Sequence, residues 1–217
     1  MKYVILFLLL FGTNLSFTQQ QIHFTNPSFE DTPRHSRTPT GWCDYGNINE
    51  SPPDTHPTKE HAFGVKQLPQ HGKTYLGMVV RENDTQESVG QQLESPLVAG
   101  NCYSLTLYLS RSDEYISLSR TANQEIKSNS PVVLRIWGGD AFYEKKELLD
   151  SSELVAHTDW RNYEFNFRPE QEVEYLIFEV FYETPTLFPY NGNMLLDNLS
   201  SIALRDCLEV DDSLKED

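Results

Sequence analysis

Hydrophobic and polar residues alternate along much of this chain, and turn-forming residues separate the alternating stretches. In the stretch 101–110, one face of an extended strand carries Tyr103, Leu105, Leu107 and Leu109. In the stretch 161–167, the corresponding face carries Tyr163, Phe165 and Phe167. A period of two is typical of a strand with one face in the core and one in solvent. The pattern therefore predicts half-buried antiparallel β-sheet.

Strand patterns of this kind cover most of the chain: they lie at 21–25, 73–80, 87–93, 101–110, 131–137, 161–167, 174–182 and within 189–207. The stretch 174–182 is apolar on both faces, which predicts a central strand. Only the stretch 143–155 suggests a helical turn or two. Many strands without a long amphipathic helix predict an all-β fold, an antiparallel β-sandwich.

The ends of the chain differ from its middle. Lys2 precedes an apolar run at 4–12, and Ser16 and Thr18 place small residues at a cleavage site, which predicts a signal peptide over 1–18. No later stretch approaches the roughly 20 apolar residues of a membrane span. We expect one domain over 19–207, a disordered acidic tail at 208–217, and a protein that is secreted or displayed at the cell surface.

Charge and loop composition narrow the classes of partner. The formal net charge of −15 argues against nucleic acid and anionic lipid, and is compatible with cation binding or with solubility alone. The segment 32–70 is a long, Pro-rich loop region, and loops of this length in compact domains are usually functional or mobile.

One acidic residue breaks the strand pattern near the end of the chain. Alternation places Asp197 on the same face as Leu195 and Leu199, where the core should be. An unpaired buried carboxylate costs several kcal/mol or becomes neutral. We therefore expect either a cation or a set of hydrogen-bond donors at Asp197.

Six motifs in a fixed order point to a family: NPSFE, TPTGWCDYG, HGKTYLGM, SPLVAGNCYSLTLYLS, DWRNYEFNF and YNGNMLLDNLSSI. Their order resembles that in carbohydrate-binding-module-like jelly rolls of the galactose-binding superfamily, over most of 22–207. ESPPD, RIWGG and LFPYNGN are similar to uncharacterised modules in secreted and surface proteins of gliding Gram-negative bacteria. The resemblance implies jelly-roll topology, and ligands vary widely within this superfamily.

The resemblance also implies a structural calcium ion near Asp197. In similar modules, calcium joins the N-terminal segment to the last strand. The matching positions here are Glu30, a backbone oxygen near Ser28, a carbonyl at Gly72 or Lys73, and Asp197. Calcium prefers six to eight oxygen ligands, which carboxylates and carbonyls supply. The alternative, in which backbone donors or a basic side chain hold Asp197, stays open.

Two of the three cysteines lie at the ends of predicted strands. Cys102 begins one strand and Cys207 follows the last one, and alternation turns both away from the core face. In an exported protein this predicts a disulfide, which in the chain-entropy model contributes about 4 kcal/mol. Cys43 remains as a buried thiol or an exposed one.

A candidate binding surface follows from the stretch 131–137. Alternation puts Arg135 and Trp137 on the noncore face, and Trp rings stack on sugars while Arg hydrogen-bonds their hydroxyls. A second candidate cluster consists of Trp42, Tyr45, Tyr190, Asn191 and Asn193. In that set, Trp42 alternatively packs beneath the first loop, and the Asn-Gly pair alternatively forms only a turn.

Catalytic motifs are missing from the sequence: there is no G-x-S-x-G, H-E-x-x-H or Gly-rich phosphate loop. The six His show no zinc-site spacing. Catalysis would need Cys43 with His56, His61 or His71, or a carboxylate pair among Asp44, Glu50, Asp54 and Glu60. We therefore predict a noncatalytic module for extracellular glycan, with no catalytic residue. The alternatives are an adhesive surface protein that acts through protein contacts and, less favoured, a metal-dependent hydrolase that uses the loop 32–70.

Overall fold

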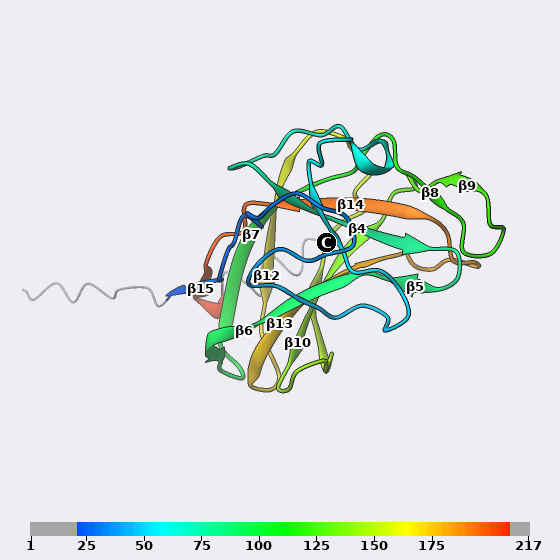
Figure 1. Ribbon diagram of the computed structural model, residues 1–217. Helices are drawn as coiled ribbons and strands as arrows, with labels where there is room; N and C mark the ends of the chain where they lie inside the picture. The colour runs from blue at the N-terminus through cyan, green and yellow to red at the C-terminus, as the bar shows by residue number, and fades with distance from the viewer. Residues whose placement is uncertain (1–20, 209–217) are drawn as a thin grey trace, which may run out of the picture.

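The structure is a computed structural model that describes residues 21–208, and two antiparallel β-sheets pack face to face in it (Figure 1). Sheet A contains β1 (Gln21–Ile22), β3 (Asp54–His56), β4 (Tyr75–Arg81), β5 (Thr85–Gln86), β7 (Cys102–Ser110), β12 (Arg161–Phe167), β14 (Gly192–Asp197) and β15 (Ile202–Arg205). Sheet B has the order β11 (Glu147–Ser151), β10 (Val133–Gly139), β13 (Val173–Phe181), β6 (Ser88–Leu97) and β2 (Cys43–Asp44). The arrangement is a β-sandwich with jelly-roll topology, as predicted.

The predicted signal peptide over 1–18 lies outside the described residues, as does the predicted tail beyond residue 208. Within the described residues, no helix is both long enough and apolar enough to cross a membrane.

The inner faces of the two sheets form the core, and the alternation in the sequence identifies them correctly. Strand β7 buries Leu105, Leu107 and Leu109 between the sheets, and the neighbouring β12 buries Phe165 and Phe167. Each buried Leu or Phe side chain contributes roughly 1.5–3 kcal/mol relative to an exposed one. Burial of one face per strand therefore stabilises the sandwich.

Strand β13 is the central strand of sheet B, as its two apolar faces predict. The helical turns expected within 143–155 are a wrong prediction, because this stretch contains strand β11. Pairing with the edge of β10 satisfies the backbone of β11, and Leu149 packs against the core. A packing partner therefore decides the structure of a stretch whose own pattern is ambiguous.

The last stretch forms two strands, not one. Asn198 adopts a left-handed conformation (φ 54°) between β14 and β15, and both strands pair with β7. Arg205 on β15 lies opposite Cys102, so Cys207 comes within reach, and the predicted disulfide between Cys102 and Cys207 is confirmed. Cys43 is a free thiol and is exposed.

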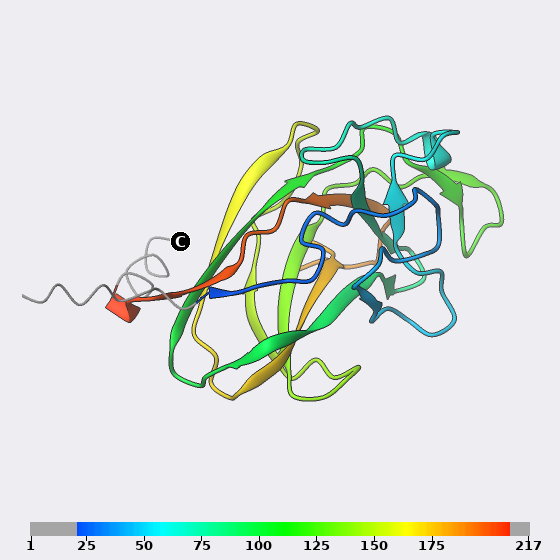
Figure 2. The same cartoon turned by 60° about the vertical axis from the view of Figure 1, so that its left-hand side comes forward.

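Loops and a hairpin cover the part of the outer face of sheet A that β4 and β14 form, whereas Asn162 and Glu164 on β12 of the same sheet are exposed. The loop region 32–70, with the short helix η1 (Ala62–Gly64), and the hairpin of β8 (Ile116–Leu118) and β9 (Glu125–Lys127) lie at one end of the molecule (Figures 1 and 2). Beneath them is a second small apolar cluster that contains Val65, Tyr75, Val79, Tyr115 and Leu195. Segments remote in sequence thus bury part of one outer face.

Candidate functional site

The outer face of sheet B carries the predicted pair of Arg135 and Trp137. Strand β10 turns Leu134 and Ile136 into the core, where both are fully buried, so the alternating Arg135 and Trp137 point outward and are half-buried. In the sheet register, Arg135 lies opposite Glu179 of strand β13.

Glu179 connects the polar side chains of this face. Trp137 Nε1 donates a hydrogen bond to Glu179 Oε2 at 2.8 Å, and Lys145 Nζ donates to Oε1 at 2.5 Å. Lys145 also donates to the hydroxyl of Ser88 at 3.1 Å. Glu179 is only 7% exposed, and burial of a carboxylate is costly unless its oxygens have such hydrogen-bond partners. Trp137, Lys145 and Glu179 therefore hold one another in place.

Arg135 is held by an aromatic ring. Its guanidinium carbon lies 3.5 Å from the centroid of the Phe181 ring, which is a cation–π contact. Burial lowers the pKa of Arg135 and the charge of Glu179 raises it, and a guanidinium with such a high ordinary pKa stays charged. Within residues 21–208, no side chain or carbonyl accepts a hydrogen bond from Arg135, which leaves its N–H groups available.

Four aromatic side chains border these residues: Tyr45, Phe142, Tyr143 and Tyr175. The rings of Phe142 and Tyr143 meet edge to face with centroids 4.3 Å apart, and their residues are 50% and 62% exposed. Tyr45 packs against both rings, and burial raises its pKa to about 12. We call Arg135, Trp137, Glu179 and Lys145, with these four aromatic residues, the sheet B platform.

Sequence reasoning missed much of the sheet B platform. Tyr175 and Glu179 lie four residues apart on one face of β13, which alternation could have predicted, but only the register of the sheet places Glu179 opposite Arg135. Lys145, Phe142 and Tyr143 belong to the loop between β10 and β11, whose residues follow no period. Only tertiary structure brings these three to the sheet.

The second predicted cluster does not form, because two of its members are buried. Trp42 is 4% exposed and packs in the core against Phe24 and Phe178. Its indole N–H donates a hydrogen bond to the carbonyl of Asn26 at 2.9 Å, so its polar atom is satisfied there. Asn193 is fully buried and donates to backbone carbonyls of the segment 112–128. Neither side chain can meet a ligand at the surface.

The other three members of that cluster lie apart or serve backbone groups. Tyr45 belongs to the sheet B platform, as described above. The Tyr190 hydroxyl donates to the carbonyl of Pro131 at 3.0 Å, and Asn191 Oδ1 accepts from the amide of Glu82 at 3.1 Å. The Asn-Gly segment therefore has a structural role here.

Asp197 is fully buried, as alternation predicts, and protein donors hold it. Its Oδ1 accepts from the Ser28 hydroxyl at 2.9 Å and from the Asn198 amide at 2.7 Å. Its Oδ2 accepts from the amides of Gln70 at 2.9 Å and His71 at 2.8 Å. A carboxylate has about four lone-pair positions, and these donors use them. Burial raises the pKa of Asp197, and these hydrogen bonds oppose that shift.

Glu30 connects the segment around Ser28 to the segment that follows His71 through hydrogen bonds. Its Oε1 accepts from the amide of Lys73 at 2.7 Å and lies directly over Gly72, where a Cβ would collide with it. Gly72 has φ 64°, a conformation that suits glycine. The N–H groups that point at both carboxylates would repel a cation. This donor set does not fit the expected calcium ion, and within residues 21–208 no three His, Cys, Asp or Glu side chains form a metal cluster.

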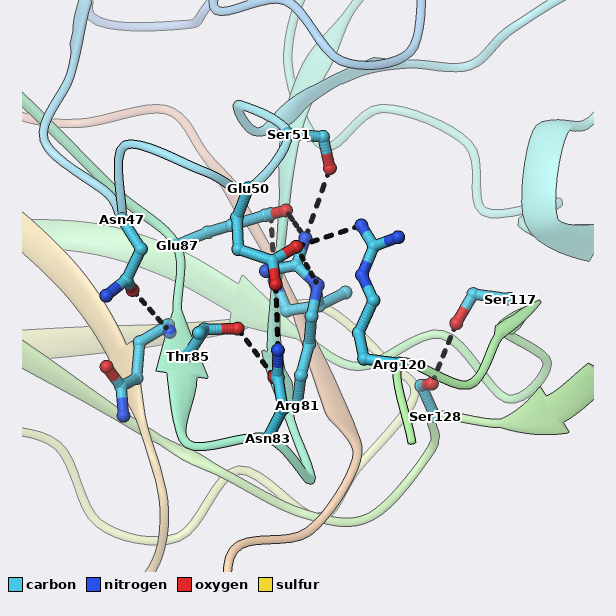
Figure 3. Close-up of polar contacts among 12 residues, drawn as sticks. Asn47, Glu50, Ser51, Arg81, Asn83, Thr85, Glu87, Ser117, Arg120 and Ser128 are labelled. Carbon is cyan, nitrogen blue, oxygen red and sulfur yellow. Dashed lines mark hydrogen bonds and ion pairs between the residues drawn. The ribbon is translucent and has the colours of Figure 1, made fainter. Parts of the chain in front are cut away.

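A network of charged side chains lies on the covered part of the outer face of sheet A (Figure 3). Arg81 Nη2 hydrogen-bonds Glu87 and donates to the Ser51 hydroxyl at 3.2 Å. Glu50 Oε2 lies 3.7 Å from Arg81 Nε and 2.9 Å from Arg120 Nη2. Arg81 and Glu87 are 8% and 4% exposed, so this network is largely removed from water.

One further acidic group, Asp54 on β3, borders this network. Burial raises the pKa of Glu87, and the nearby Asp54 adds to this effect while Arg81 opposes it. The Tyr115 hydroxyl donates to Asp54 Oδ2 at 3.1 Å. The candidate pair of Cys43 and His56 does not assemble: Cys43 lies on an edge strand of sheet B, whereas His56 is buried on β3 of sheet A.

Comparison with known proteins adds information on the fold only. No protein-family model matches the chain, and no curated protein matches it. A Stig cyclase from Fischerella sp. TAU, solved with (3Z)-3-(1-methyl-2-pyrrolidinylidene)-3H-indole, is 13% identical over 87% of this chain and 98% of its own, with a TM-score of 0.51. The apo form of a cyclase from Fischerella sp. is 13% identical over 86% and 96%, with a TM-score of 0.50.

A third solved structure is the CBM22-1 xylan-binding domain of Paenibacillus barcinonensis Xyn10C. It is 14% identical over 82% of this chain and 90% of its own, with a TM-score of 0.44. At identities this low, the similarity to the cyclases shows a shared fold and carries no chemistry. The expected similarity to modules of gliding bacteria stays a prediction.

Proposed function

We propose that this protein is a noncatalytic binding module and that its ligand is an extracellular glycan bound on the sheet B platform. The observation that carries the proposal is the arrangement of Arg135, Trp137, Glu179 and Lys145 on the outer face of sheet B, beside the exposed rings of Phe142 and Tyr143. Aromatic rings stack on the apolar faces of sugars, and charged donors and acceptors hydrogen-bond their hydroxyls.

The position of the platform on the sheet favours an extended, polymeric ligand. It lies on regular strands β10 and β13 with one bordering loop, so its side chains are held by packing rather than by a mobile segment. Rigid placement limits the entropy lost on binding. The outer face of a sheet suits a polymer that passes across it.

The proposed location of the protein is outside the cytoplasm. The disulfide between Cys102 and Cys207 supports it, because such bonds persist mainly in oxidising compartments. The net charge of −15 makes neutral polysaccharides better candidates than acidic ones.

A glycan array and pull-down on insoluble polysaccharides test the proposal with three variants. We expect Trp137→Ala and Phe142→Ala to weaken binding at least about tenfold, because each removes a ring that would stack on a sugar. Phe188→Ala is the matched control: Phe188 is 77% exposed but follows the far end of β13 from the loop that holds Phe142. Binding that survives both platform variants would overturn the site, and the absence of any bound glycan would favour a protein partner.

A further inference from the structure

The outer face of sheet A contains a small cavity that the proposed glycan platform does not use. It has a volume of about 220 Å³, and its lining includes Phe63, Tyr115, Arg81, Arg120, Ser51 and Ser117. This volume is below the roughly 300–1,000 Å³ of pockets for drug-sized ligands. The cavity therefore admits one small ring and excludes a chain segment.

Aromatic rings form one wall of this cavity. The rings of Phe63 and Tyr115 stack with centroids 4.9 Å apart and planes 10° from parallel. Tyr115 is fixed by its hydrogen bond to Asp54, and Phe63 packs against the small apolar cluster. The wall is therefore rigid before any ligand binds.

Val79 and Leu118 add apolar lining, the other lining groups are polar, and the charges of the polar groups and their partners nearly cancel. Arg81 and Arg120 contribute guanidinium N–H groups, but Glu87 and Glu50 already pair with them (Figure 3). Asp54 lies nearby and adds negative charge. An anionic ligand would have to displace these carboxylates, whereas a neutral ligand with hydroxyl groups can use the remaining donors and the Ser hydroxyls without doing so.

The backbone at the aromatic wall is strained. His61 and Phe63 both adopt left-handed conformations, with φ 49° and φ 61°, within the short helix η1 and its N-terminal flank. Bulky residues seldom adopt this conformation, and such strain concentrates at binding sites. Phe63 also lines a second, wider hollow of about 620 Å³.

We propose that this cavity is a second binding site, which takes a single neutral sugar ring stacked on Phe63 and hydrogen-bonded to the network of Arg81 and Arg120. The site lies on the opposite sheet from the platform and does not depend on it. It would bind a terminal sugar residue, whereas the platform suits the interior of a chain.

Titrations followed by amide NMR shifts test this proposal, with glucose, galactose, mannose, xylose and the charged glucuronate as separate probes. We expect at least one neutral sugar to shift the amides of Phe63, Ser117 and Arg120. Shifts confined to Tyr175 and Phe142 would place binding on the platform and overturn the second site. Shifts at the cavity with glucuronate alone would show an anion site, which also contradicts the proposal, as would no shift with any sugar.

Phe63→Asn is the informative variant, because Asn tolerates the left-handed conformation and removes the ring. We expect it to weaken the affinity of the cavity about tenfold. Arg120→Gln, at an exposed position, removes the charge and keeps a donor, so it tests the polar side with little risk to folding. Phe188→Ala is the control. Unchanged affinity in both cavity variants would overturn the proposal.

Discussion

The outer face of sheet B and the outer face of sheet A both combine arginine, carboxylate and aromatic side chains, but they differ in what covers them. On sheet B, Arg135 lies on a Phe ring and keeps its N–H groups unused. On sheet A, Arg81 is 8% exposed and is paired with Glu87 and Glu50 beneath the loop region 32–70. Arg135 is therefore available for binding on sheet B, whereas Arg81 on sheet A is already held in buried ion pairs.

This difference has an energetic basis. Exposed ion pairs contribute about 0–1 kcal/mol, whereas a buried charge that loses its partner is costly. Substitutions at the buried pair of Arg81 and Glu87 should therefore change stability first, and substitutions on the sheet B platform should change binding first. Measurements of both quantities on the same variants test the comparison.

The largest effect is expected at the buried pair of Arg81 and Glu87. Arg81→Met leaves Glu87 buried without its cation, and we expect the free energy of unfolding to fall by about 3–5 kcal/mol. Adding Glu87→Leu should restore part of this loss, because it removes the unpaired charge. Chemical denaturation of the wild type, the single variants and the double variant measures both steps. A double variant less stable than Arg81→Met would show that Glu87 contributes through other contacts.

A slightly smaller loss is expected at Asp197. Asp197→Ala leaves the amides of Gln70, His71 and Asn198 buried without an acceptor, and we expect the free energy of unfolding, measured by chemical denaturation, to fall by about 3 kcal/mol.

Thermal unfolding with calcium and then with excess chelator should give equal midpoints for the wild type, because the donor set leaves no position for the ion. If chelator lowers the unfolding midpoint and calcium, but not magnesium, raises it again, the expected structural calcium ion near Asp197 is present after all.

Much of the fold could be predicted because the core obeys a simple period. Alternation alone identifies the inward residues of β7 and β10 and the central position of β13. It fails for β11, whose strand structure depends on pairing with β10, and for the break at Asn198 between β14 and β15. These features arise from neighbours in space, which a local pattern does not contain.

The candidate site was predictable only where it lies on strands. Arg135 and Trp137 follow from alternation, whereas Lys145 reaches Glu179 from a loop, across 34 positions of sequence. Trp42 was ambiguous because the residues around it follow no period, and its direction depends on packing against Phe24 and Phe178. For Asp197, sequence predicts burial but not the donors, three of which are more than 120 positions away.

A smaller, pH-dependent effect is expected at the start of the loop that covers sheet A. Hydrogen bonds from the Thr40 hydroxyl and the Thr32 amide lower the pKa of Asp31 from 3.8 to about 2. Because the pKa is lowered on folding, Asp31 stabilises the folded protein above about pH 4, and this contribution is lost as the pH falls towards 2. Unfolding midpoints between pH 5 and 2, compared with those of Asp31→Asn, measure it, and equal slopes for the two proteins would contradict it.

The smallest effect on stability is expected at the sheet B platform. Phe142 is 50% exposed and contacts mainly the other aromatic residues of the platform, so we expect Phe142→Ala to change the free energy of unfolding by about 0.5 kcal/mol or less. The same variant should lose glycan binding, whereas Arg81→Met should lose stability. Chemical denaturation and glycan binding on one preparation of each variant separate the two faces. A large loss of stability in Phe142→Ala would mean that the platform aromatics are part of the folded core, and that this face is structural too.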